Sequence, residues 1–229
     1  MSELRFALVA SPLLGPASWR PAAAALAARG QRAAVADFGD VAADDTYDAI
    51  ADRAAAAIAP GQEPLVLVGH SGAGGLLAGI ARRSDPAGVI FVDAILPHPG
   101  RSWLETMTPA FGKRLKGMAV DGRLPPWNRW VSDDPVARLV ADPAARAELV
   151  AALPSIPLAY LAAHAPDWPP IAAPCAYVQL SETYAREAIA ARAGAWEVVR
   201  QEAHHLAMVT DPARMADVLT AVAESLVTS

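Results

Sequence analysis

The sequence predicts a single α/β domain, with a mostly parallel sheet of about six strands, helices on both faces and an inserted helical cap. Three observations predict this class. Apolar runs of strand length alternate with longer helical patterns in the first part of the chain. The alternation stops over residues 95–170 and resumes from residue 174. Because parallel strands are joined by right-handed crossovers through helices, such alternation is typical of a parallel sheet that is buried on both faces.

Four strands and three helices are expected before the break. Each expected strand is a short run rich in apolar residues, and the expected helices are longer and rich in alanine, a strong helix former. Gly30 ends the first helix. The expected strands are residues 4–10, 31–38, 64–69 and 87–93, and the expected helices are residues 19–29, 45–58 and 72–84.

Two more strands and two helices are expected after the break. The strands are residues 174–180 and 195–201, and residues 184–193 form the helix between them. The final helix opens at Asp211-Pro212, because an aspartate can cap the first turn and a proline ring suits its first position. Residues 95–170 are rich in proline and contain short helical patterns and no convincing strand. We therefore expect one domain over residues 1–229, with this segment as the inserted cap.

Composition narrows the classes of function. The chain has 229 residues and a net charge of −5, and its arginines are scattered among acidic residues. Nucleic acid binding needs clustered positive charge, so no nucleic acid partner is expected. No apolar run reaches the length of a membrane span, and the chain begins without a signal-peptide pattern. The single cysteine, Cys175, cannot form an internal disulfide and fits a small buried position. We expect a cytoplasmic protein without a membrane partner.

Ser71 lies where an apolar strand meets a glycine-rich helix start, in the stretch LVLVGHSGAGG. A Gly-x-Ser-x-Gly elbow needs small residues two positions before and after the serine, because the backbone is strained there. Gly69 meets the first requirement, and Ala73 meets the second with one extra methyl group. The pattern predicts Ser71 as a nucleophile rather than part of a plain turn between two buried elements.

A serine nucleophile needs a base, and the chain order serine, acid, histidine places it in the loop after the last strand. That loop reads EAHHLAMVTDP, so His204 and His205 compete. It resembles the histidine loop of the α/β-hydrolase superfamily, particularly the branch of plant methylesterases and hydroxynitrile lyases, and related bacterial hydrolases. In that branch a proline follows the catalytic histidine by seven positions, so Pro212 selects His205. The stretch LVASPLLGPASW resembles the branch's first strand and loop, with Trp19 at the matching tryptophan.

The acid of the triad has two candidates. Relatives carry an aspartate shortly after the strand that corresponds to AYVQL, where this chain has Ser181-Glu182-Thr183, so Glu182 is one candidate. The other is Asp93 in VIFVDAILP, which resembles the strand that ends in the triad acid of some haloalkane dehalogenases. An unpaired buried carboxylate is unfavourable, so Asp93 should have a partner, although it could instead cap its own turn. The sequence favours Asp93 over Glu182.

The expected oxyanion hole is the part of the site whose sequence differs most from that of the resembling branch. Its first donor is expected to be the backbone N–H of Gly72, at the start of a helix where negative charge is favoured. The second donor of relatives aligns with Ala10, Ser11 and Pro12, and proline has no N–H. Either the Leu13 N–H donates from a shifted loop, or the Ser11 hydroxyl substitutes, as a threonine does in the resembling hydroxynitrile lyases.

Four of the six tryptophans lie in the expected cap. The substrate-binding candidates are Trp103, Trp127 and Trp130 of the cap, with His70 beside the nucleophile. We expect about half of the large apolar and aromatic residues of this cap to serve only its packing. Aromatic residues above the open end of a sheet also line apolar pockets, so we expect a small, moderately hydrophobic substrate.

These residues predict a serine hydrolase that cleaves a carboxylic ester, a thioester or a lactone, with no metal or organic cofactor. Two alternatives stay open because a fold does not determine a reaction. One is a cofactor-free lyase or other non-hydrolytic enzyme, and the other is a small-molecule binding protein without turnover. The resembling lyases have a lysine directly after the catalytic histidine, and Leu206 at that position argues against a lyase.

Overall fold

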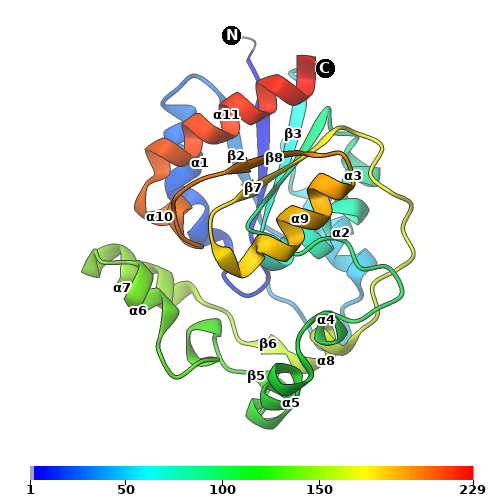
Figure 1. Ribbon diagram of the computed structural model, residues 1–229, viewed down its shortest axis with the longest axis vertical. Coiled ribbons are helices and arrows are strands. Elements are labelled where there is room, and N and C mark those ends of the chain that lie inside the picture. The colour runs from blue at the N-terminus through cyan, green and yellow to red at the C-terminus, as the bar shows by residue number, and fades with distance from the viewer. Residues whose placement is uncertain (1–2, 229) are drawn as a thin grey trace.

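The computed structural model describes residues 3–228 and contains a six-stranded, wholly parallel sheet. Figure 1 shows the sheet with its surrounding helices, and the strand order is β2-β1-β3-β4-β7-β8. The predicted fold class is therefore confirmed. The strands are β1 (Arg5–Val9), β2 (Arg32–Ala36), β3 (Leu65–His70), β4 (Gly88–Val92), β7 (Cys175–Gln179) and β8 (Glu197–Arg200).

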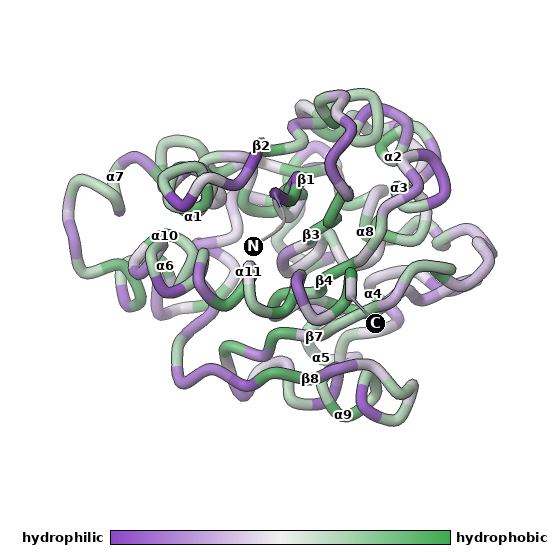
Figure 2. The backbone as a smooth tube through the Cα atoms, turned by 90° about the horizontal axis from the view of Figure 1, so that it is seen from above, coloured by the Kyte–Doolittle hydropathy of each residue, from purple (hydrophilic) through white to green (hydrophobic). Residues whose placement is uncertain are grey.

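Helices cover both faces of the sheet. One face packs on α1 (Arg20–Ala27), α10 (Ala207–Thr210) and α11 (Pro212–Thr228). The other face packs on α2 (Tyr47–Ala56), α3 (Leu77–Ser84) and α9 (Ala185–Ala193). Figure 2 shows hydrophobic residues along the central strands that these helices enclose.

Successive residues of the central strands belong to opposite cores. In β3, Val66 and Val68 pack toward α1 and α11, while Leu65 and Leu67 pack toward α2 and α3. Every residue of β3 is buried, which explains why the sequence shows a continuous apolar run there and no alternation. Burial on both faces places all the polar functional groups at the ends of the strands.

The helix expected at residues 72–84 forms in two parts. A 3₁₀ turn, η2 (Ser71–Gly75), precedes α3. Glycine is a poor helix former, and three glycines occur within this turn. A side chain at Gly74 would overlap the carbonyl oxygen of Ile95, so the turn lies directly against the backbone that follows β4.

Between β4 and β7 the chain forms short helices and one small antiparallel strand pair, in the lower part of Figure 1. We call residues 95–170 the insertion. The expectation of no strand there is wrong, because β5 pairs with β6. Each of these strands has two residues, too few for a periodic pattern. The elements are α4 (Trp103–Thr106), α5 (Pro109–Met118), β5 (Arg123–Leu124), η3 (Trp127–Arg129), α6 (Pro135–Leu139), α7 (Pro143–Ala152), β6 (Ile156–Pro157) and α8 (Leu158–Ala162).

Part of the insertion, including Trp103, Leu124 and Tyr160, belongs to the core that also contains α2 and α3. Another part packs on loops that follow the strands, through a third apolar cluster. This cluster joins α6 and α7 to the loop after β1, which contains η1 (Pro16–Ser18), and to the loop after β8. Its buried members are Leu14, Ala17, Val136, Val140, Leu149, Leu153 and Leu206. The insertion is thus fixed to the two loops that carry the expected oxyanion donors and the expected base.

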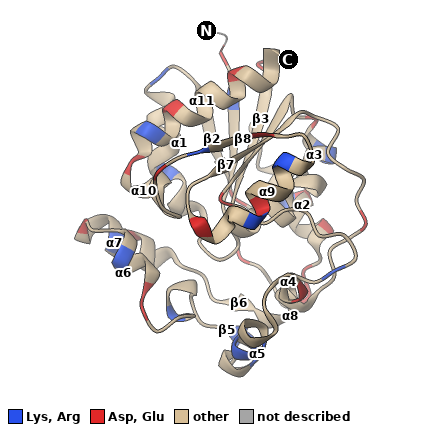
Figure 3. Ribbon diagram, in the orientation of Figure 1, with Lys and Arg blue, Asp and Glu red and all other residues tan. Residues whose placement is uncertain are grey.

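The surface mixes both signs of charge. Figure 3 shows acidic and basic residues interspersed over the helices of the sheet and over the insertion. Among residues 3–228, no helix combines the length and the apolar character needed to cross a membrane.

Candidate active site

The expected site residues gather at one edge of the sheet, because the carboxyl ends of parallel strands lie together. Each comes from the segment after a different strand: Ser11 after β1, Ser71 after β3, Asp93 after β4, Glu182 after β7 and His205 after β8. Long loops and helices separate these segments in the chain, and the sheet brings their ends together.

Ser71 occupies a strained turn at the end of β3. Its φ of 56° lies in the left-handed region that residues other than glycine rarely adopt. A Cβ at Gly69 would come within 2.7 Å of the Leu77 side chain, while the methyl group of Ala73 is accommodated in the core. Ser71 is 4% exposed. The backbone therefore holds this hydroxyl in one place at the edge of the sheet, as a nucleophile elbow does.

Asp93 is fully buried and satisfied by four hydrogen bonds. Its Oδ1 accepts from the backbone N–H groups of Leu180 at 2.7 Å and Ser181 at 3.0 Å. Its Oδ2 accepts from the Ser181 hydroxyl at 2.6 Å and from Nδ1 of His205 at 3.0 Å. These donors compensate the loss of water around a buried carboxylate. The fourth bond orients the imidazole so that its Nε2 is the nitrogen left for a proton transfer.

Glu182, the other candidate acid, lies in the 3₁₀ turn η4 (Glu182–Tyr184) and is exposed. Its carboxylate forms an ion pair with Arg200 of β8. The structure therefore places Asp93 against His205 and directs Glu182 to the surface.

Aromatic rings surround the His205 imidazole. The Tyr184 ring stacks on it with centroids 5.0 Å apart and planes 7° apart. The Trp127 ring of the insertion lies 5.8 Å away, and the His70 ring lies 4.4 Å away. The His205 side chain is 12% exposed. This setting leaves little water near the group that would accept the serine proton.

His70 does not occupy the substrate-facing position expected from the sequence. It is fully buried, and its Nε2 donates to the backbone carbonyl of His205 at 2.9 Å. Its Nδ1 is buried without a hydrogen-bond partner. Burial, and then the proximity of His205, lower the pKa of His70 well below its ordinary value. A neutral His70 therefore supports the main chain of the expected base.

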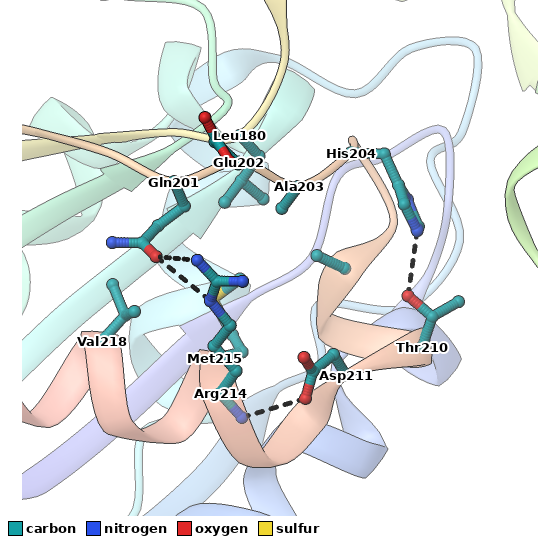
Figure 4. Close-up of a pocket in the computed structure, with 11 residues that line it drawn as sticks. Leu180, Gln201, Glu202, Ala203, His204, Thr210, Asp211, Arg214, Met215 and Val218 are labelled. Atoms are coloured by element: carbon teal, nitrogen blue, oxygen red, sulfur yellow. Dashed lines mark hydrogen bonds between the residues drawn. The ribbon is translucent and has the colours of Figure 1, made fainter.

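The ring of His204 bonds the turn that follows it. Its Nδ1 accepts from the backbone N–H of Leu206 at 3.2 Å. Its Nε2 bonds the Thr210 hydroxyl at 3.1 Å, as Figure 4 shows. His204 also borders a pocket of about 190 Å³ between the loop after β8 and the start of α11. Both ring nitrogens of His204 thus stabilise the turn that leads into α10.

The hydroxyl of Ser71 is 3.3 Å from the hydroxyl of Tyr184. Within residues 3–228, no hydrogen bond joins Ser71 Oγ to the imidazole of His205. No sequence motif marks Tyr184, although it lies just beyond the place where relatives carry the acid. A serine, a histidine and a tyrosine thus meet at the centre of this site.

Of the three expected oxyanion residues, Gly72 and Leu13 both bond the hydroxyl oxygen of the third, Ser11. Ser11 Oγ accepts from the Gly72 N–H at 3.3 Å and from the Leu13 N–H at 3.2 Å. A serine oxygen accepts two hydrogen bonds and keeps one hydrogen to donate. The sequence left open whether the Leu13 N–H or the Ser11 hydroxyl is the second donor. In the structure the two groups bond each other, and two backbone donors polarise the Ser11 hydroxyl.

Two of the three candidate tryptophans lie at the site. Trp103 lies directly against Gly72, because a side chain at Gly72 would overlap its ring. The ring of Trp127 lies 5.8 Å from that of His205. Trp130 instead packs within the insertion, where its Nε1 donates to the Pro125 carbonyl at 2.8 Å and its ring lies 6.5 Å from Phe111.

Across residues 3–228, no group of three or more His, Cys, Asp or Glu side chains is placed to hold a metal ion. Cys175 is buried, and burial raises the pKa of its thiol to about 12.

Comparison with known proteins agrees with this fold. The family model described as the alpha/beta hydrolase family matches residues 6–218. No curated protein sequence matches the chain. Solved structures under 25% identical match its fold over almost the whole chain.

An extracellular alpha/beta-hydrolase from a Paenibacillus species, described as sharing structural and functional homology to tobacco salicylic acid binding protein 2, has a TM-score of 0.78 at 17% identity, over 96% of this chain and 98% of its own. Tomato methylketone synthase I, complexed with 2-tridecanone, has a TM-score of 0.74 at 17% identity, over 99% and 100%. A pyrethroid hydrolase from Sphingobium faniae JZ-2 has a TM-score of 0.68 at 19% identity, over 99% and 100%.

Proposed function

Since the chain belongs to the alpha/beta hydrolase family, as its sequence predicted, we propose that it is a serine hydrolase with Ser71 as nucleophile, His205 as base and Asp93 as acid. Its substrate would be a carboxylic ester, a thioester or a lactone of a small, moderately hydrophobic molecule. One observation carries the proposal: Asp93 bonds Nδ1 of His205 at 3.0 Å, at the edge of the sheet where Ser71 occupies its strained turn.

The reaction would proceed in two steps. Ser71 Oγ attacks the acyl carbon while its proton passes to Nε2 of His205, and the leaving alcohol or thiol then takes that proton. Water next attacks the acyl group on Ser71 and gives one proton to the same nitrogen. The bond from the acyl carbon to Oγ then breaks, Oγ takes that proton back, and the carboxylic acid is released. Asp93 keeps Nδ1 protonated and stabilises the imidazolium that forms in each step.

The negative charge on the substrate oxygen would be stabilised mainly through the Ser11 hydroxyl. Because Ser11 Oγ accepts from Gly72 and Leu13, its own hydrogen is left to donate to the substrate. Hydrogen bonds in such a chain strengthen one another. This arrangement supplies a donor at the place where Pro12 removes the backbone N–H of relatives.

The aromatic side chains at the site support the proposal that the substrate is moderately hydrophobic. Trp103 lies on Gly72, Trp127 approaches His205, and both come from the insertion, which would act as a cap within one domain. Leu206 is fully buried in the apolar cluster beneath the insertion. A lyase of the resembling branch would need a lysine there, and this leucine disfavours that alternative. The scheme uses no metal or organic cofactor.

Labelling with a fluorophosphonate tests the nucleophile. Intact-mass measurement should show one adduct on the wild-type protein and none on Ser71→Ala, and product analysis on a panel of esters, thioesters and lactones should show hydrolysis that is lost in the same variant. A folded wild-type protein that forms no adduct would indicate a binding protein, while products of bond cleavage without water addition would indicate a lyase.

A further inference from the structure

The loop after β7 delivers two hydroxyl groups to the proposed triad. The Ser181 hydroxyl donates to Asp93 at 2.6 Å, and the Tyr184 hydroxyl lies 3.3 Å from Ser71 Oγ. Glu182, between them, points away and pairs with Arg200. The loop therefore contacts both the acid and the nucleophile without supplying a carboxylate.

Tyr184 is held in place from two sides. Its ring stacks on the His205 imidazole, and the backbone of Ser181, three residues earlier, is bonded to Asp93. Directly after Tyr184 the chain enters α9, whose Ala188 packs in the core. The Tyr184 hydroxyl is thus positioned by the same contacts that position the triad, rather than by a free loop.

Tyr184 keeps its proton under ordinary conditions. Burial raises the pKa of its hydroxyl well above the usual value, and the charges of Asp93 and Glu187 add to this, while the bond to Ser71 opposes it. A protonated tyrosine can donate to Ser71 Oγ, and the serine hydrogen then stays available for Nε2 of His205.

We propose that Tyr184 is a catalytic residue that donates a hydrogen bond to Ser71 Oγ and so favours departure of this oxygen when the acyl-enzyme is hydrolysed. The inference rests on the proposed serine hydrolase function. In that step a water oxygen bonds the acyl carbon and gives one proton to Nε2 of His205. The bond from the acyl carbon to Oγ then breaks, its electron pair stays on Oγ, and Oγ takes the proton back from Nε2. Tyr184 keeps its own proton throughout.

A donor on Oγ affects the two halves of the reaction in opposite ways. It stabilises the oxygen as negative charge builds up during departure, as donors do at developing charges in active sites. It also withdraws electron density from the same oxygen when that oxygen acts as the nucleophile. Tyr184 should therefore speed hydrolysis of the acyl-enzyme and leave its formation unchanged or slightly slower.

Stopped-flow kinetics with p-nitrophenyl acetate separate the two halves. Tyr184→Phe keeps the ring on His205 and removes only the hydroxyl. We expect it to slow deacylation by about tenfold, the effect of one hydrogen bond, while acylation stays equal or becomes faster. The burst of nitrophenolate should rise toward one per site, and intact-mass measurement should find acetyl on Ser71.

Tyr47→Phe is the matched control, because it removes the hydroxyl of a second tyrosine, which is buried and whose bond to Nε2 of His98 is also 3.3 Å long. Both of its rates should equal those of wild type. If Tyr184→Phe does not fold, Tyr184→Leu also lacks the hydroxyl and must show slow deacylation.

Two results would overturn the role of Tyr184 alone: unchanged rates in a folded variant without the hydroxyl, or equal slowing of both steps, in each case with an active wild type. A wild-type protein that forms no acyl-enzyme would instead overturn the proposed function, and this inference with it.

Discussion

The loops after β4 and β7 each carry a carboxylate at the same edge of the sheet, in opposite surroundings. Asp93, directly after β4, is fully buried and accepts four hydrogen bonds, one of them from His205. The Glu182 side chain, shortly after β7, is 71% exposed and pairs with an Arg200 side chain that is 64% exposed. An exposed ion pair of this kind contributes at most about 1 kcal/mol to stability.

The difference shows that both loops contribute to the surroundings of Asp93, the proposed triad acid. The loop after β4 supplies the charge, and the loop after β7 supplies three donors that hold it, the N–H groups of Leu180 and Ser181 and the Ser181 hydroxyl. A carboxylate orients a histidine best where water does not compete for it and where fixed donors satisfy its other lone pairs. Substitutions of Asp93, Ser181 and Glu182 test these two roles, and their expected effects decrease in that order.

Asp93→Asn should lower kcat on any ester substrate by about 10³- to 10⁴-fold, because an amide holds the histidine in the wrong tautomer. Steady-state kinetics measure this effect, and circular dichroism checks that the variant folds. A folded Asp93→Asn variant with nearly full activity would move the acid away from β4.

Ser181→Ala should lower kcat by about tenfold and the free energy of unfolding by about 1–2 kcal/mol, because a buried carboxylate loses one of its donors. KM should change little, since Ser181 contacts Asp93 and not the proposed substrate position. Kinetics and urea unfolding of the same preparation measure both effects. Ser181→Thr retains a hydroxyl and should recover most of the rate. An alanine variant with wild-type kcat and stability would show that the loop after β7 contributes nothing to the acid.

Glu182→Gln should change kcat by less than about twofold and stability by no more than about 0.5 kcal/mol, because the residue is exposed and its ion pair is screened by water. The same assays apply. A loss larger than that of Asp93→Asn, with both variants folded, would reverse the comparison and place the acid after β7.

The layout of the sheet could be predicted from the sequence because the signals are local. The strand expected at residues 87–93 is β4, Gly88–Val92, and the last helix begins at Pro212 as expected. Runs of apolar residues and helix starts depend on neighbours within a few positions. The strands β5 and β6 and the short helix α10 were not predictable in this way, because elements of two to four residues carry no periodic pattern.

The candidate site, too, could be predicted where its signals are local and not where it depends on distant residues. The elbow at Ser71 is encoded within a few residues, from Gly69 to Ala73, and spacing to Pro212 singled out His205 from His204. The contact of Asp93 with His205 joins residues 112 positions apart, and that of Ser71 with Tyr184 joins residues 113 apart. Local propensity carries no information about such pairs.

The sequence by itself determined the strands and the longer helices of the six-stranded sheet, and where a strained serine turn lies. Only the tertiary structure decided which carboxylate meets the histidine and which hydroxyl meets the serine. The physical reason is the strand order β4-β7-β8, which places the ends of three separate segments side by side. Strand order depends on how the two faces of the sheet pack against their helices. A buried carboxylate with four hydrogen-bond donors is possible only where the ends of these strands meet.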